Sequence, residues 1–206
     1  MLFNRNTENN TYLVVGLGNI GERYDGTRHN IGFCAVDRLS KALSAPIPRA
    51  KFSSLTTGAK LGGFKVVIMK PTTFMNLSGK AVLEAVSFYK LPSENVIVFT
   101  DDISLGLGSV RIRAEGSHGG HNGLRDIAIM LSTERYTRVR IGVGAKPHPN
   151  YDLADWVLGR FTQAENTELE AVLEKVPDIV LEIMKNGVAS AQNRYGKTVR
   201  SQRGGS

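Results

Sequence analysis

The residues best suited to chemistry lie in a glycine-rich stretch past the middle of the chain. Four glycines stand from Gly116 to Gly123, and His118, His121 and Asn122 are set among them. Glycine lets the backbone adopt left-handed conformations and approach a ligand closely, whereas a loop that only connects two elements needs fewer glycines. The stretch therefore indicates a flexible rim over a binding site. A long turn before a helix is the plainer interpretation.

His29 is the best candidate for a base. It stands in the polar sequence Thr-Arg-His-Asn just before a helical pattern, where a surface histidine is the plainer interpretation. An unperturbed histidine has a pKa of about 6.5, so it can take a proton from water near neutral pH. Asp101 and Asp102 directly follow an apolar strand pattern. By themselves these two aspartates would be interpreted as turn residues.

A literal G-x-G-x-x-G motif, Gly16 to Gly21, follows the first predicted strand. A dinucleotide-binding fingerprint needs a helix that opens at the third glycine and an acidic residue after a second strand. Here the segment that follows lacks apolar periodicity, and Asp37 lies inside a helical pattern. We therefore reject nucleotide binding. Asn19 then becomes a polar side chain at the carboxyl end of a strand, where open α/β sheets place their sites.

The composition is that of an ordinary globular protein. The chain has 206 residues, of which 41% are hydrophobic and 22% charged, and this suits one domain with a buried core. Its single cysteine, Cys34, excludes an internal disulfide and favours a reducing cytoplasm. We expect Cys34 to be a small core residue. No run approaches the ~18 apolar residues of a membrane span, and the polar start of the chain does not resemble a signal peptide.

We expect a single α/β domain over residues 12–196, between a flexible N-terminus (1–11) and a flexible basic tail (197–206). Strand and helix patterns alternate, which predicts a mixed, twisted β-sheet covered by helices on both faces. Strands are predicted at 12–16, 53–59, 65–69, 95–100, 109–114 and 138–143, and helices at 30–45, 77–90, 122–131, 155–158 and 162–191. Pro177 is expected to kink or divide the last helix.

Basic residues outnumber acidic ones, 26 to 19, which gives a formal charge of +7. Two pairs of arginines alternate along predicted strands, Arg111 with Arg113 and Arg138 with Arg140. Residues two apart on a strand share a face, so each pair points to one side of the sheet. Phosphate contacts with a nucleic acid and a plain solvated face are both open interpretations.

Two further stretches share the polar character of residues 116–123. They are residues 19–32, which include Thr-Arg-His-Asn, and residues 70–79, with the sequence Lys-Pro-Thr-Thr-Phe-Met-Asn-Leu-Ser-Gly. Together the three motifs resemble the bacterial-type peptidyl-tRNA hydrolases, which cleave the ester joining a stalled peptide to the 3′ end of its tRNA. The resemblance runs in order from about Tyr12 to about Arg200, nearly the whole chain.

The resemblance implies roles for individual residues. His29 matches the family's catalytic histidine and Asp101 its paired aspartate, which would fix the tautomer of the imidazole and stabilise its charged form. Asn76 and Asn122 match two active-site asparagines, whose neutral amides both donate and accept hydrogen bonds. From its position alone, Asn76 would instead cap the following helix.

Other matches concern substrate recognition. Asn19 matches the residue thought to distinguish blocked from free amino groups; an uncharged pocket suits that task, because burying an ammonium without a counter-charge is costly. Tyr24 and Phe74 match positions linked to tRNA binding, where aromatic rings can stack on unpaired bases. The tRNA phosphates would be contacted by the arginines of the two strand pairs, Arg111, Arg113, Arg138 and Arg140.

The resemblance implies peptidyl-tRNA as the partner, no membrane association, no metal or cofactor, and a monomer in the cytoplasm. His118 and His121, three residues apart in a loop without nearby cysteines, make a weak zinc signal. We expect His118 to belong to the rim and His121 to be a hydrogen-bonding neighbour of Asn122.

The sequence departs from the family in two loops. Ile20 stands where a proline is common, and Ser104 with Gly106 stands where an acidic residue and a proline are common. A different class of function is also open, because relatives in plastids act in RNA splicing as non-catalytic scaffolds. Such a scaffold need not retain a catalytic set. The presence of His29, Asp101 and the three asparagines favours the enzyme.

Overall fold

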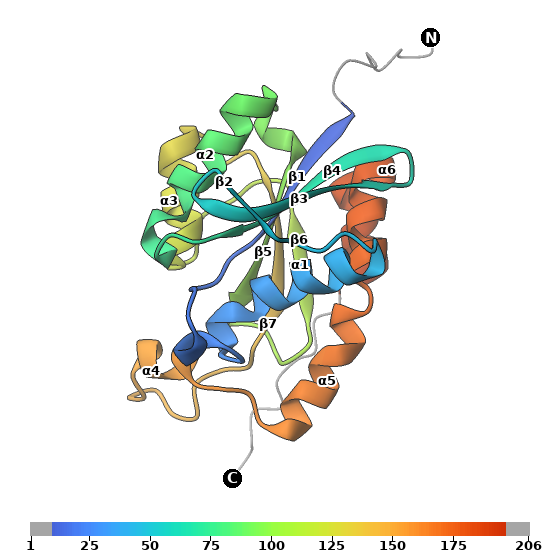
Figure 1. Ribbon diagram of the computed structural model, residues 1–206. Helices are drawn as coiled ribbons and strands as arrows, with labels where there is room; N and C mark the ends of the chain where they lie inside the picture. Colours follow the sequence, from blue (N-terminus) through green and yellow to red (C-terminus); the bar gives the residue numbers. More distant parts are fainter. Residues whose placement is uncertain (1–9, 197–206) are drawn as a thin grey trace.

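Seven strands form one sheet in the computed structural model, which describes residues 10–196 (Figure 1). The strands are β1 (Thr11–Gly16), β2 (Arg49–Lys51), β3 (Ser54–Leu61), β4 (Phe64–Pro71), β5 (Val96–Asp102), β6 (Val110–Arg113) and β7 (Thr137–Gly142). Their order is β2-β3-β4-β1-β5-β7-β6. The central strands β4, β1, β5 and β7 are parallel, while β2, β3 and β6 pair antiparallel toward the two edges. The predicted mixed sheet is confirmed.

Helices cover both faces of this sheet, as predicted (Figure 1). On one face lie α1 (Ile31–Ala42), α5 (Gln163–Leu173) and α6 (Val176–Tyr195), and on the other lie α2 (Ser78–Tyr89) and α3 (Asn122–Leu131). The short helix α4 (Leu153–Leu158) lies beside the start of α1. Four 3-10 turns complete the described part: η1 (Glu22–Tyr24), η2 (Arg28–Asn30), η3 (Met75–Leu77) and η4 (Ser93–Asn95).

Alternating side chains divide the core into two layers. In β5, Ile97 and Phe99 pack in the layer formed with α1, α5 and α6, whereas Val96 and Val98 pack in the layer formed with α2 and α3. All four side chains are fully buried. Because side chains two apart share a face, Asp101 continues the series of Ile97 and Phe99. The strand therefore presents its carboxylate on the α1 face.

The first turn of α1 lies directly on the sheet. A Cβ atom on Gly32 would come within 2.5 Å of the carbonyl oxygens of Leu17 and Phe99. Only glycine permits so close an approach. Since η2 immediately precedes α1, this packing brings His29 to the carboxyl end of β5.

Some expected boundaries differ from the structure. Thr11 already belongs to β1, and the short, exposed strand β2 was not predicted because nothing in its sequence alternates. Pro177 lies in the first turn of α6, so it divides the predicted helix 162–191 into α5 and α6. The bend within α6 occurs instead at Gly187, where φ is 84°.

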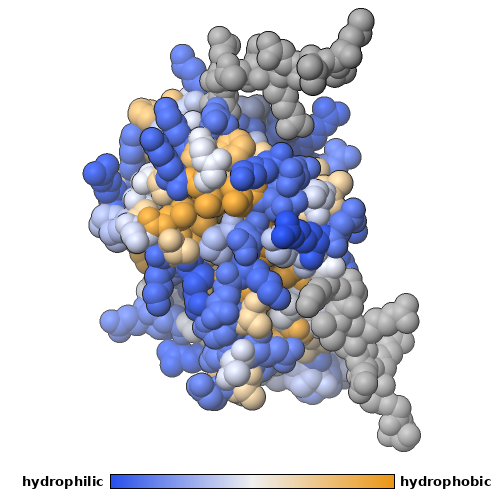
Figure 2. Space-filling view, turned by 90° about the vertical axis from the view of Figure 1, so that its right-hand side faces the viewer, coloured by the Kyte–Doolittle hydropathy of each residue, from blue (hydrophilic) through white to orange (hydrophobic). Residues whose placement is uncertain are grey.

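Gly21 is followed by the single turn η1 and not by an α-helix, in keeping with the rejection of a nucleotide motif. The remaining expected flexible ends, 1–9 and 197–206, lie outside the described residues. No helix within residues 10–196 is long and apolar enough to cross a bilayer. On the side of the β3–β4 hairpin and α6, hydrophilic side chains surround a limited apolar area (Figure 2).

We expect Gly32→Ala to destabilise the protein by about 1–3 kcal/mol, the usual cost of forcing extra atoms into a packed core. It should also lower activity, because α1 must move away from the sheet and carry His29 with it. Denaturant unfolding and turnover measure the two effects. Gly58→Ala is the matched control, since a Cβ there meets no atom within 4 Å; equal unfolding free energies for both variants would contradict the close packing of α1.

Candidate active site

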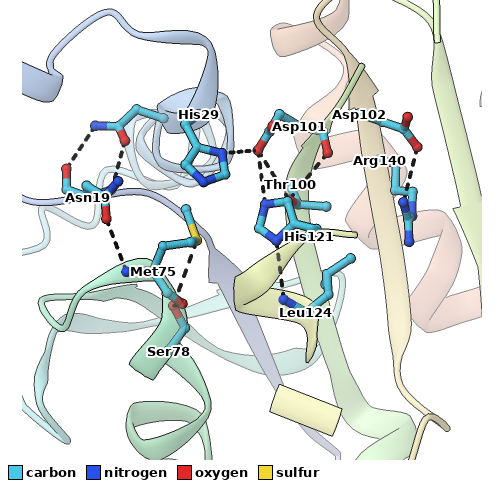
Figure 3. Close-up of polar contacts among 11 residues, drawn as sticks. Asn19, His29, Met75, Ser78, Thr100, Asp101, Asp102, His121, Leu124 and Arg140 are labelled. Atoms are coloured by element: carbon cyan, nitrogen blue, oxygen red, sulfur yellow. Dashed lines mark hydrogen bonds and ion pairs between the residues drawn. The ribbon is translucent and has the colours of Figure 1, made fainter. Parts of the chain in front are cut away.

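Asp101 is the buried centre of the site. It lies near the end of β5, beside Ile141 of β7, and only 5% of its surface is exposed. A buried carboxylate is costly unless it is paired or hydrogen-bonded. Figure 3 shows how this demand is met, because the rings of His29 and His121 both reach the same oxygen of Asp101.

His29 reaches Asp101 from η2. Its Nδ1 lies 2.9 Å from Oδ1 of Asp101. An ionised carboxylate only accepts hydrogen bonds, so Nδ1 of the neutral ring carries the proton and Nε2 keeps a lone pair. This is the protonation pattern that a general base requires. The sequence-predicted pairing of these two residues is present, although they are 72 positions apart.

His121 has a different partner from the one expected. It is the N-cap of α3, and its Nδ1 accepts the backbone N–H of Leu124 at 3.3 Å. Its Nε2 therefore carries the proton and donates to Oδ1 of Asp101 at 3.1 Å. The expected hydrogen bond with Asn122 is thus replaced by one with Asp101, because the capping position directs the ring back toward β5. The sequence signal that could have revealed this role is the position of His121 directly before the predicted helix 122–131. A residue at this N-cap position can accept the backbone N–H of the residue three positions later, here Leu124.

The two imidazoles control the charge of Asp101. Burial alone would raise the pKa of Asp101, because its charged form loses hydration. The His121 ring and then the His29 ring outweigh burial and hold the pKa of Asp101 well below its ordinary value. Asp101 is therefore an ionised acceptor across the pH range in which histidines ordinarily titrate.

Asn19 is fixed by hydrogen bonds to two neighbouring segments. Its backbone N–H donates to Oδ1 of Asn30 at 2.8 Å, and its carbonyl accepts from Nδ2 of Asn30 at 3.0 Å. Its side-chain Oδ1 accepts the N–H of Met75 at 3.1 Å (Figure 3). The amide of Asn19 is consequently held in one orientation, with Nδ2 as the group left to donate to a ligand.

A cavity of about 510 Å³ opens over this cluster, a size typical of ligand sites. The predicted rim is part of it, since Gly119 and Gly120 line the cavity. Other lining residues come from the strand ends, the turn η2, the start of α3 and the region of α4: Asn19, His29, Asp101, Asp102, Ile103, His121, Asn122, Arg140, Asp152, Leu153, Ala154, Val157 and Leu158. The contribution of α4 was not expected, because its mostly apolar side chains carry no chemical signature.

Three of the expected substrate-binding residues lie outside the described lining of this cavity. Asn76 is exposed within η3 and does not cap α2, whose N-cap is Leu77. Phe74 is 66% exposed. Tyr24 is half-buried, and the guanidinium of Arg23 donates to its hydroxyl at 2.6 Å while lying 4.5 Å from the ring centroid. The roles of these three residues remain predictions.

Arg140 connects the rim to the end of β5. Its guanidinium donates to Oδ2 of Asp102 at 3.2 Å and to the carbonyl of Ser117 at 2.9 Å. Asp102 also accepts from the backbone N–H and the hydroxyl of Ser104, at 2.8 and 2.6 Å. Asp102 is therefore more than a turn residue, and Ser104, one of the departures from the family pattern, ties its own loop to the strand.

The paired arginines occupy one face of the sheet, as predicted. Arg111 pairs with Arg140 and Arg113 with Arg138 across β6 and β7. The expectation of a phosphate contact is wrong for Arg138, which is 1% exposed. It lies against the ring of Tyr136 and donates to the backbone carbonyls of Glu134 and Tyr136. Arg113 is exposed, and Arg111 and Arg140 are partly exposed.

The same cluster is the candidate metal site among the described residues. His29, Asp101 and His121 each offer one ligand atom, and the three atoms lie within 4.8 Å of one another. Nitrogen and carboxylate ligands of this kind suit zinc. The two hydrogen bonds to Asp101 already account for the convergence of these side chains, so the geometry does not call for a metal. A metal-free site remains a prediction.

The fold and the site together define an α/β protein in which a cavity at the strand ends holds an aspartate-paired histidine, the arrangement used by hydrolases that activate a nucleophile. The model of the peptidyl-tRNA hydrolase family matches residues 13–203. A peptidyl-tRNA hydrolase of Caldanaerobacter subterraneus subsp. tengcongensis is 48% identical over 184 residues, which cover 89% of this chain and 98% of that protein. One from a Thermoanaerobacter species is 45% identical with the same coverage.

Solved structures agree with these sequence matches. The crystal structure of peptidyl-tRNA hydrolase from Acinetobacter baumannii has a TM-score of 0.85 and 30% identity, covering 92% of this chain and 96% of that one. A complex of peptidyl-tRNA hydrolase with N-propanol has the same TM-score and 31% identity. This chain belongs to the peptidyl-tRNA hydrolase family.

We expect the pKa of Asp101 to appear in the acid stability of the protein. Because the pKa is lowered in the folded state, its stabilising contribution is present above the unfolded pKa of about 3.9 and is lost as pH falls below it toward the folded pKa. Thermal unfolding of the wild type should therefore decline more steeply below about pH 4 than that of Asp101→Asn, which has no carboxyl group to titrate. Parallel curves in this range would contradict the pairing of Asp101 with the two rings.

Proposed function

We propose that the protein hydrolyses the ester between an N-blocked peptide and the 3′ ribose of tRNA, with His29 as the general base. The observation that carries the proposal is the 2.9 Å contact between Nδ1 of His29 and the buried carboxylate of Asp101 beside the main cavity. Membership of the peptidyl-tRNA hydrolase family supports the substrate. In cells, this reaction would return tRNA from stalled or dropped-off peptides.

The proposed chemistry follows from the tautomers. Nε2 of His29 takes a proton from water while the oxygen of that water attacks the ester carbonyl. Asp101 stabilises the imidazolium that forms, as the aspartate does in serine hydrolases. When the ester C–O bond breaks, His29 returns the proton to the departing 3′ oxygen. The products are a peptide acid and tRNA with a free hydroxyl.

The neutral amides and basic groups would then bind the rest of the substrate. Asn19 and Asn122 line the cavity and can hydrogen-bond the water or the peptide carbonyls without changing the charge of His29. Asn76, exposed on η3, would extend this set toward the peptide. Tyr24 and Phe74 would stack on unpaired bases of the tRNA end, and Arg111, Arg113 and Arg140 would contact its phosphates. We expect a monomer as the working unit, as the family resemblance implies.

His29→Ala should lower kcat on N-acetyl-aminoacyl-tRNA by about 100- to 10,000-fold, the usual contribution of a general base, while tRNA binding stays intact. The matched control is His148→Ala, which removes an exposed histidine outside the cavity lining. Near-wild-type turnover of His29→Ala would remove this residue as the base.

The same assay tests the second class of function. A non-catalytic RNA-binding scaffold would bind tRNA tightly and release no N-acetylated amino acid. The intact hydrogen-bonded pair of His29 and Asp101 favours the enzyme over this alternative.

We expect Arg113→Ala to reduce the dependence of tRNA affinity on salt by about one unit of slope, because one fewer counterion is released on binding. The matched control is Lys60→Ala, which removes an exposed cation from β3, near the opposite edge of the sheet. Binding measured between low and moderate salt gives both slopes. An unchanged slope for Arg113→Ala would show that Arg113 does not contact phosphate.

A further inference from the structure

Arg28, the residue before His29 in η2, is a buried cation held from several sides. It is 5% exposed. Its guanidinium donates to both carboxylate oxygens of Glu165, at 2.8 and 3.1 Å, and to the carbonyl of Arg160 at 2.7 Å. Both bonds to Glu165 come from Nη2, whereas Nη1 bonds the carbonyl of Arg160, so the two terminal nitrogens reach two partners at once. The single nitrogen of a lysine does not offer this planar pair of donors.

The same guanidinium packs on aromatic rings next to the cavity. Its central carbon lies 3.8 Å from the ring centroid of Trp156 and 5.1 Å from that of Phe161. Trp156 belongs to α4, and its indole N–H donates to the carbonyl of Gly144, just after β7, at 3.1 Å. Arg28 therefore contacts the helix that forms one wall of the cavity.

The backbone joins the same two segments. The N–H of Arg28 donates to the carbonyl of Gly159 at 3.0 Å, directly after α4, and Thr27 forms an isolated antiparallel bridge with Arg160. The segment that carries the base and the segment that leaves α4 are thus bonded through main chain as well as side chain. In Figure 1, α4 lies beside the start of α1 for this reason.

We propose that Arg28 is a positioning residue that holds α4 and His29 as one unit, so that a single side chain sets both the cavity wall and the direction of the base. The inference rests on the proposed function, because it takes His29 as the base. Arg28 does not line the cavity, whereas His29 and the α4 residues Leu153 and Val157 do. Its effect on the reaction therefore passes through these neighbours.

The test uses a probe that the chain already contains. Trp156 is the single tryptophan, so its fluorescence reports on α4 in the intact protein without substrate. Arg28→Lys keeps the charge but loses the fork and the flat stacking surface. We expect acrylamide to quench Trp156 fluorescence more strongly in this variant.

The kinetics of Arg28→Lys should change as well. We expect kcat to fall about 10- to 100-fold, since small displacements of a base are costly. KM for N-acetyl-aminoacyl-tRNA should rise, while the affinity for deacylated tRNA is unchanged.

Two matched variants separate positioning from general stability. Glu165→Gln removes the charge that faces Arg28, yet glutamine can still complete the capping box that Glu165 forms with Thr162. This variant should also lower kcat and increase the quenching of Trp156 fluorescence, but by less than Arg28→Lys does. Thr162→Ala removes the side-chain cap of α5 and leaves the partners of Arg28 in place. It should lower Tm without changing kcat, KM or quenching.

Folded Arg28→Lys with wild-type kcat, KM and quenching would overturn the inference. A fall in kcat of Thr162→Ala that matches its loss of stability would also overturn it, because activity would then follow stability alone. Wild-type protein that fails to hydrolyse the substrate would overturn the proposed function, and Trp156 quenching would still decide whether Arg28 holds α4.

Discussion

The site depends on a single buried oxygen, Oδ1 of Asp101, that two imidazoles share. A carboxylate with 5% exposure needs donors, and the donors come from two separate segments: His29 from the turn before α1 and His121 from the start of α3. Each ring is thereby held in one tautomer. One charge thus orders three segments that are remote in sequence, and it leaves the lone pair of His29 free for chemistry.

The backbone brings the donors to that charge through close packing. Gly32 lets the first turn of α1 rest on the carbonyls of Leu17 and Phe99, while the alternation of β5 points Asp101 to the same face. On the other face, Gly123 lets α3 approach Met75, because a Cβ there would lie 2.7 Å from the Met75 sulfur. The geometry of the candidate site is therefore set by the close packing of α1 and α3 as well as by the hydrogen bonds to Asp101.

Much of this could be predicted from the sequence. The strand and helix patterns predicted the mixed sheet, and the resemblance to a known family implied the pairing of His29 with Asp101. What they missed depends on three-dimensional packing. The role of His121 follows from a cap bond that points its ring at β5, and the burial of Arg138 follows from its neighbours, since alternation indicates a face but not what covers it. Helix α4 lines the cavity through apolar residues that carry no chemical signal.

The ion pair between Arg140 and Asp102 bears on how salt would influence the binding of RNA. Asp102 serves Arg140 as a built-in counter-ion, so an RNA phosphate arriving there would displace a protein carboxylate in place of a dissolved ion. Lowering the salt concentration would therefore strengthen this contact less than it strengthens a contact with an unpaired cation. It would also free the carbonyl of Ser117, which Arg140 now holds. Docking of the acceptor stem and loosening of the glycine-rich rim would then be parts of the same event.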